Sequence, residues 1–64
     1  MAKFTIFLEY SDDSESCFEV SVEGSWHDIY ALLCMITRGT LMASMAKKAT
    51  CYNYEGFEVC SYIK

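Results

Sequence analysis

The segment from Ser25 to Lys48 most constrains the fold, because its helical pattern is apolar around most of the circumference. At about 100° per residue, one apolar stripe consists of Ile29, Leu32, Leu33, Ile36 and Ala43. A second stripe consists of Tyr30, Cys34, Leu41 and Met45, and the opposite side carries Met35 and Met42. A helix of one small domain needs a single stripe to cover its core. The remaining apolar surface predicts contact with a second copy of the chain or with another protein.

The length of the chain strengthens this expectation. With 64 residues it forms at most a single domain, residues 1–64. A core of this size rarely supplies more than about 3–5 kcal/mol of net stability, so small proteins commonly add a disulfide, a metal or an oligomer contact. The hydrophobic fraction of 53% is more than so small a domain readily buries. We therefore expect a homo-oligomer, most simply a homodimer.

Two pairs of alternating segments flank the helical segment. Residues 3–10 and 17–23 alternate apolar and polar side chains, which predicts two strands joined by a polar turn. Residues 49–54 and 57–63 predict a second hairpin, closed by a type I turn at Asn53-Tyr54-Glu55-Gly56. The predicted fold is an α+β domain of order β-β-α-β-β: a four-stranded antiparallel sheet with one helix on one face.

The alternation also assigns the faces of the strands. The side expected to face the helix carries Phe4, Ile6, Leu8, Tyr10, Phe18, Val20 and Val22. The outer face is expected to carry Phe7, Cys17 and Tyr62. In the second hairpin, Thr50 and Tyr52 are predicted to share a face with Phe57 and Val59. The outer face is therefore expected to be modestly apolar.

The ends of the helix are marked by polar residues. Ser25 followed by Asp28 resembles a capping box with an aspartate in place of the usual glutamate, so the helix is expected to begin at Trp26 and run to about Lys47. Gly39 costs about 1 kcal/mol relative to alanine inside a helix. We favour one helix, bent at this point, over two helices divided there. Lys47 and Lys48 would then complement the negative end of the helix.

The cysteines give little indication of a metal or redox site. Cys17, Cys34, Cys51 and Cys60 include no Cys-x-x-Cys pair, and His27 is an isolated histidine, so we expect no metal and no cofactor. A disulfide between Cys51 and Cys60 requires a two-residue loop. With the type I turn, Cys51 instead faces Glu58. We expect reduced thiols and a cytosolic protein, because the chain also shows no signal peptide or membrane-spanning run.

The residues needed for catalysis are also missing. The chain has one histidine, and it lacks a nucleophile elbow and a glycine-rich phosphate loop. His27 and Asp28 are neighbours on a helix and therefore point apart. The acidic turn around Asp12 and Asp13 lacks the glycine and the ligand spacing of a calcium-binding loop. We therefore expect the protein not to be an enzyme.

The net charge of −4 disfavours nucleic-acid binding, which normally uses a basic patch. The sequence instead predicts a protein-binding homodimer, formed through its helix or a sheet edge and without chemistry of its own, such as an accessory or inhibitor protein. Its predicted partner-binding residues are Tyr30, Met35, Leu41, Met42 and Met45. Two alternatives stay open: an acidic mimic of nucleic acid that blocks a basic partner, and a cysteine-based metal or redox site.

Overall fold

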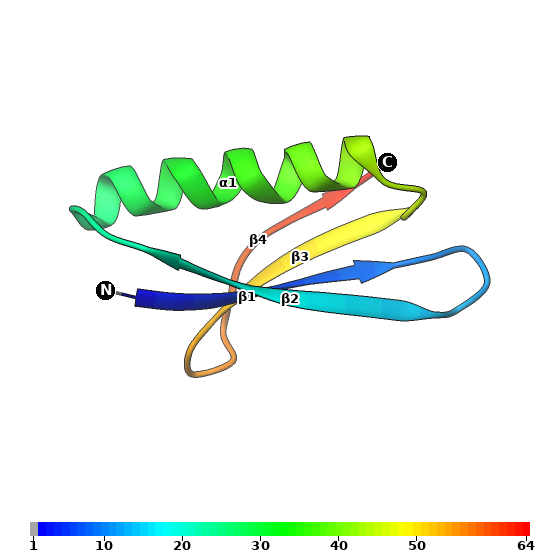
Figure 1. Ribbon diagram of the computed structural model, residues 1–64, viewed down its shortest axis with the longest axis horizontal. Helices are drawn as coiled ribbons and strands as arrows, with labels where there is room; N and C mark the ends of the chain where they lie inside the picture. The colour runs from blue at the N-terminus through cyan, green and yellow to red at the C-terminus, as the bar shows by residue number, and fades with distance from the viewer. Residues whose placement is uncertain (1) are drawn as a thin grey trace.

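The computed structural model describes residues 2–64 and confirms the predicted order of elements (Figure 1). The elements are β1 (Ala2–Glu9), β2 (Glu15–Val22), α1 (Trp26–Ala43), β3 (Lys48–Asn53) and β4 (Glu58–Ile63). The strands form one antiparallel sheet in the order β2-β1-β3-β4. β1 and β3 are therefore central, β2 and β4 are the two edges, and α1 lies across one face.

The first hairpin is regular from end to end. Every residue of β1 pairs with one of β2, from Ala2 opposite Val22 to Glu9 opposite Glu15. The loop is closed by the Tyr10 amide, which donates to the Ser14 carbonyl at 2.9 Å. The Asp12 carboxylate accepts hydrogen bonds from the Ser14 amide and hydroxyl, and these bonds lower the pKa of Asp12. A short local network thus fixes the polar turn.

Ser25 caps the start of α1 as predicted, and the Asp28 carboxylate bonds the hydroxyl of Ser25 and not its backbone amide. The Ser25 hydroxyl donates to the Asp28 carboxylate at 3.0 Å and accepts from the Asp28 amide at 3.3 Å. The helix then continues through Gly39, so the prediction of one helix is confirmed. The bond from the Asp28 amide satisfies one of the backbone donors that the first turn of a helix leaves without an intrahelical partner.

The predicted end of α1 near Lys47 is wrong, because the helix stops at Ala43. The Ser44 hydroxyl donates to the Leu41 carbonyl at 3.1 Å and accepts from the Ala46 amide at 3.2 Å. A serine that bonds nearby backbone groups in this way offers an alternative to helical pairing. Lys47 and Lys48 therefore do not complement the end of the helix. The Lys47 amide donates to the Glu9 carbonyl, and Lys48 begins β3.

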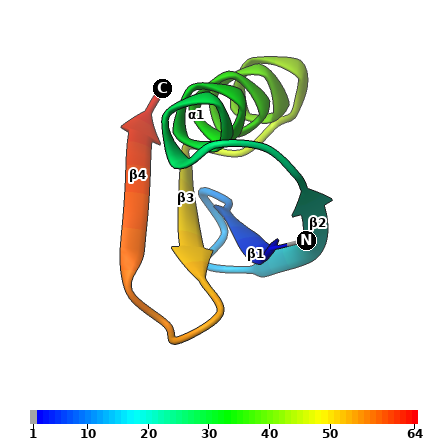
Figure 2. The same cartoon turned by 90° about the vertical axis from the view of Figure 1, so that its left-hand side faces the viewer.

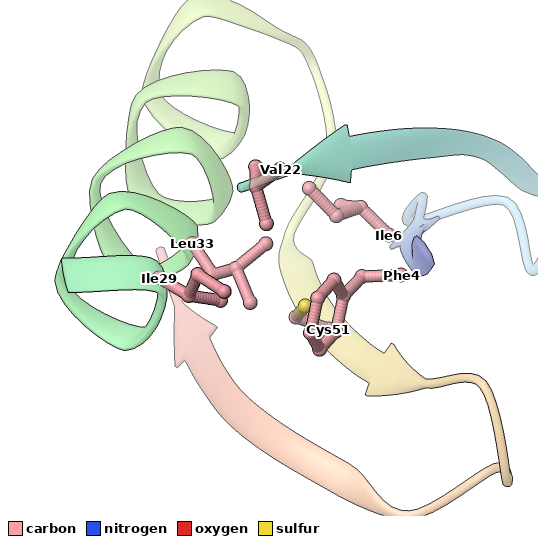
Figure 3. Close-up of a cluster of buried hydrophobic side chains, with 6 residues drawn as sticks. All are labelled: Phe4, Ile6, Val22, Ile29, Leu33 and Cys51. Atoms are coloured by element: carbon pink, nitrogen blue, oxygen red, sulfur yellow. The ribbon is translucent and has the colours of Figure 1, made fainter. Parts of the chain in front are cut away.

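The core lies between α1 and the sheet in two adjoining clusters. Figure 3 shows the larger one, where side chains from β1, β2, α1 and β3 point toward one another: Phe4, Ile6, Val22, Ile29, Leu33 and Cys51. The smaller cluster joins Leu8, Leu41, Ala46 and Ala49. The buried stripe of α1 is Ile29, Leu33, Thr37 and Leu41, spaced four residues apart. The predicted stripe was therefore partly wrong, since Leu32 and Ala43 are exposed.

The helix does not cover the sheet evenly. α1 packs mainly on β3 and β4, and β2 stands to one side (Figure 2). Val22 at the end of β2 is buried, but Phe18 on the same face is 37% exposed. The prediction that Phe18 is a core residue is thus wrong, because the helix does not extend over it. Tyr62 packs against the core and so lies on the inner rather than the outer face.

The predicted turn in the second hairpin is confirmed. The Gly56 amide donates to the Asn53 carbonyl at 3.0 Å, and Gly56 adopts a left-handed φ of 88°. The Asn53 side-chain oxygen accepts from the amides of Glu55 and Phe57, each at 2.9 Å. This is the common hairpin loop in which a type I turn precedes a left-handed residue.

The predicted register of this hairpin is wrong, because Cys51 lies opposite Cys60 and not opposite Glu58. The left-handed glycine lets Asn53 pair with Phe57, which adds one residue to the β4 side. A second irregularity next to Tyr52 adds Val59, which packs against the core. Val59 therefore does not share a face with Tyr52, whose ring contacts Phe7 on the outer face.

Candidate protein-interaction surface

The structure brings only some of the predicted partner-binding residues to the surface. Met35, Met42 and Met45 are 71%, 63% and 89% exposed, and Tyr30 is 46% exposed. Leu41 is 1% exposed and packs in the cluster with Leu8, so its assignment to the binding surface is corrected. The reason is the rotation of α1 about its own axis, which decides the residues that face the sheet. Leu41 lies two i+4 steps from Leu33, on the stripe that faces the sheet.

We call the side of α1 that points away from the sheet the outer helix surface. It consists of exposed residues: Asp28, Ala31, Leu32, Met35, Arg38, Gly39 and Met42. Leu32 is 42% exposed and was missed as a surface residue. Its neighbours Leu33 and Ile36 are both apolar, so periodicity alone did not separate it from the core. The same i+4 spacing occurs in Leu32 and Ile36 and in Ile29 and Leu33, so no pattern in the sequence separates the buried stripe from Leu32.

The chemistry of the outer helix surface is apolar and nearly neutral. Asp28 and Arg38 are its only charged residues, one of each sign, whereas the whole chain has a net charge of −4. Methionine side chains are flexible and polarizable, so they adapt to the shape of a partner. Apolar residues grouped in this way on a small protein mark an interaction surface.

Tyr30 and Met45 lie apart from this surface. Tyr30 is on the flank of α1 that faces β4, where a hydrogen bond with Cys34 raises the pKa of the phenol. Met45 follows the end of the helix, in the connection to β3. The predicted residues therefore form one group on the outer helix surface, Met35 and Met42, and two separate positions.

Thiols gather beneath the same flank of α1, between the helix and the strands β3 and β4. Burial raises the pKa of Cys60 to about 11, and its sulfur lies 3.7 Å from the Thr37 hydroxyl. Burial also raises the pKa of Cys51. A thiol with a raised pKa is protonated at neutral pH and is a poor nucleophile. Cys17 lies apart from this group, exposed on β2.

Neither metal binding nor an acid–base pair is supported by the geometry. Across residues 2–64, no group of three or more His, Cys, Asp or Glu side chains is placed to hold a metal ion. The Asp28 carboxylate accepts from Ser25 in the helix cap, so its hydrogen bond serves the start of α1 and not His27. The position of the Asp28 carboxylate is therefore explained by its role in capping the helix.

The outer face of the sheet contains a shallow hollow of about 440 Å³. The rings of Phe7 and Tyr52 meet edge to face within it, with centroids 5.4 Å apart. Its rim includes Glu9 and Glu15, which are directly opposite each other on β1 and β2. Lys47 and Glu9 together line a neighbouring hollow. The outer face is thus mixed in character, whereas the outer helix surface is continuous and apolar.

The single helix of residues 2–64 is too short or too polar to cross a membrane. Comparison with protein-family models, curated proteins and solved structures yields no match for this chain.

Proposed function

We propose that this chain is a non-catalytic protein-binding module that forms a homodimer through the outer helix surface. The observation that carries the proposal is the exposure of Leu32, Met35 and Met42 on a helix whose opposite stripe already fills the core. Leaving such side chains in water forgoes roughly 1.5–3 kcal/mol each of burial free energy. An accessory or inhibitory role in the cytosol is consistent with the small size and four free thiols.

A second copy of the chain fits this surface for reasons of charge and shape. Acidic chains repel one another, but the outer helix surface carries one charge of each sign. An antiparallel helix pair with its two-fold axis at Met35 places Ala31 of each copy beside Gly39 of the other, because both lie four residues from Met35. Small residues at such positions let two helices approach closely. A Cβ at Gly39 would meet no atom within 4 Å, so packing inside the protomer does not require glycine there.

Sedimentation equilibrium at micromolar concentrations tests this proposal. We expect the wild type to be a dimer and the double variant Met35→Glu, Met42→Glu to dissociate at least about tenfold more readily, because it buries like charges at the contact. The matched control is Tyr54→Glu, Phe57→Glu, which adds the same charge at exposed positions of the β3–β4 loop. A monomeric wild type, or equal dissociation of both variants, would contradict the proposal.

The acidic-mimic alternative retains one supporting observation. Asp12, Asp13, Glu15 and Glu19 are all exposed on the first hairpin, away from α1. Neutralising them to asparagine and glutamine is expected to abolish capture by a basic partner if this alternative holds, with the fold unchanged by circular dichroism. The cysteine-based alternative has no such support, because burial raises the pKa of both Cys51 and Cys60.

A further inference from the structure

The two edges of the sheet differ in a way that points to a second binding surface. β4 is six residues long and is interrupted by the irregularity that adds Val59. β2 is eight residues long and pairs with β1 in one continuous register. Proteins commonly protect edge strands with bulges, prolines, lysines or short length. β4 has such protection, whereas β2 has no bulge, proline or lysine.

The inner face beside β2 is also incompletely covered. Phe18 of β2 is 37% exposed and Val20 is half-buried. On α1, Leu32 and Ile36 lie one turn apart on the flank opposite Cys34, the residue that contacts β4. This flank is therefore directed toward β2. A further strand beside β2 would place apolar side chains next to Phe18, under the flank of the helix.

The backbone of β2 is arranged to receive such a strand. The bond between Tyr10 and Ser14 sets the alternation of the first hairpin, so the even-numbered residues of β2 bond to β1. The amide and carbonyl groups of Cys17, Glu19 and Ser21 consequently point away from β1, toward the open edge. They form a row of donors and acceptors without a neighbouring strand among residues 2–64.

Charge indicates the kind of strand that fits. The side chains of Glu15 and Glu19 lie on the outer face of β2. Adjacent strands are about 4.8 Å apart, which brings the outer side chains of an added strand beside these carboxylates. A second β2 would bring more glutamates to the same place and is disfavoured. Lysine or arginine on the outer side and apolar residues on the inner side match both faces.

We propose that the β2 edge binds an extended segment of a partner protein in which apolar residues alternate with lysine or arginine, adding a fifth strand to the sheet. This inference names the kind of partner that the module binds and uses a surface separate from the outer helix surface. Main-chain hydrogen bonds supply affinity in this mode, and the alternating side chains supply specificity.

The test uses three synthetic peptides of about eight residues, a typical strand length. The first alternates lysine and valine, the second has the same composition in two blocks, and the third replaces lysine by glutamate. We expect the alternating lysine peptide to bind at least about tenfold more tightly than the others by isothermal titration calorimetry. Amide NMR shifts on binding are expected along β2 and not along β4.

Two variants and a control establish the position of the strand. Cys17→Pro removes one amide that points to the open edge and spares the bonds to β1, so affinity is expected to fall about tenfold. Ile63→Pro, at the corresponding outward position of β4, is the control and is expected to leave binding unchanged. Glu19→Lys is expected to reverse the preference toward the glutamate peptide, and it introduces no proline that would disturb the strand.

Each opposing result overturns the inference. Equal binding of the block peptide would show charge attraction without strand pairing, and no binding of the alternating peptide would exclude the site. Unchanged affinity in Cys17→Pro, or loss only in Ile63→Pro, would place the peptide elsewhere. The double variant Met35→Glu, Met42→Glu is expected to bind the peptide normally, so failure of the dimer and failure of this site are distinguishable.

Discussion

Thr37 shows how a polar residue becomes part of the core. Its hydroxyl donates to the Leu33 carbonyl at 2.7 Å, and the Thr37 hydroxyl oxygen in turn accepts from the Cys60 thiol at 3.7 Å. No buried side-chain nitrogen or oxygen lacks a hydrogen-bond partner within residues 2–64. A buried hydroxyl that finds a partner in its own helix avoids the cost of about 1–3 kcal/mol for an unsatisfied group. The Thr37 hydroxyl and the Cys60 thiol beneath α1 are thus explained by hydrogen bonds within the core.

The raised pKa of Cys60 predicts a loss of stability in alkali. Its ordinary value is 9.0 and burial raises it to about 11, so the folded protein holds this proton more tightly than the unfolded chain. The contribution of the protonated Cys60 thiol to the free energy of unfolding is complete below about pH 9 and is lost as the pH rises toward 11. We expect the free energy of unfolding, measured in urea, to decline across that range.

Substitution of cysteines isolates this effect. Cys60→Ala is expected to show a shallower decline between pH 9 and 11, while Cys17→Ala, at an exposed position, is expected to follow the wild type. Tyr62 titrates higher, because a hydrogen bond with Cys34 is the main cause that raises its pKa to about 12. Identical pH profiles for wild type and Cys60→Ala would contradict the assignment.

At the scale of elements, the features set by neighbouring residues were predicted from the sequence, and the features set by contacts between distant segments were not. The alternating strands, the Ser25 cap and the turn at Gly56 each depend on a few neighbouring residues, and all three were predicted. The end of α1 depends on Ser44 bonding outside the helix, and the β4 register depends on an irregularity with no marked residue. Neither has a distinctive sequence pattern.

The rotation of α1 was predicted only in part, for a related reason. A helix that is apolar on most sides does not specify which stripe faces the sheet. Leu32 and Leu41 consequently exchanged their predicted environments, and Met35 and Met42 are exposed. Which strands form the edges was not predicted, because edges depend on strand order within the sheet, and the sequence shows only the order along the chain.

Gly39 provides a test of α1 as an element. A methyl group there would meet open space, so Gly39→Ala is expected to raise the free energy of unfolding by about 0.5–1 kcal/mol through helix propensity alone. The substitution is made in the Met35→Glu, Met42→Glu background, so that association does not contribute. Urea unfolding measures the difference, and a destabilised variant would show that Gly39 has a role within the protomer.

At the scale of the molecule, one helix leaves part of a four-stranded sheet uncovered. α1 packs mainly on β3 and β4, and the loop of the first hairpin extends beyond the end of the helix (Figure 1). A single core in so short a chain supplies little net stability. The exposed residues on the outer helix surface and beside β2 are the places where a second protein would add to it.

Stability is therefore expected to depend on protein concentration. By mass action, association of folded protomers raises the melting temperature as concentration rises. We expect calorimetry to show this increase for the wild type and a smaller increase, beginning at higher concentration, for Met35→Glu, Met42→Glu. A wild-type melting temperature that is independent of concentration from micromolar to millimolar would argue against the homodimer.

The irregularity at Val59 has a consequence for the size of any assembly. If both edges of the sheet were regular, strands added to each side would propagate into an open-ended fibre. Because Val59 interrupts β4, this edge is less regular than the β2 edge and less suited to an added strand. Deleting Val59 would make β4 regular without moving Cys60 from its place opposite Cys51. That deletion would give the sheet a second regular edge, and it would also remove a side chain that packs against the core.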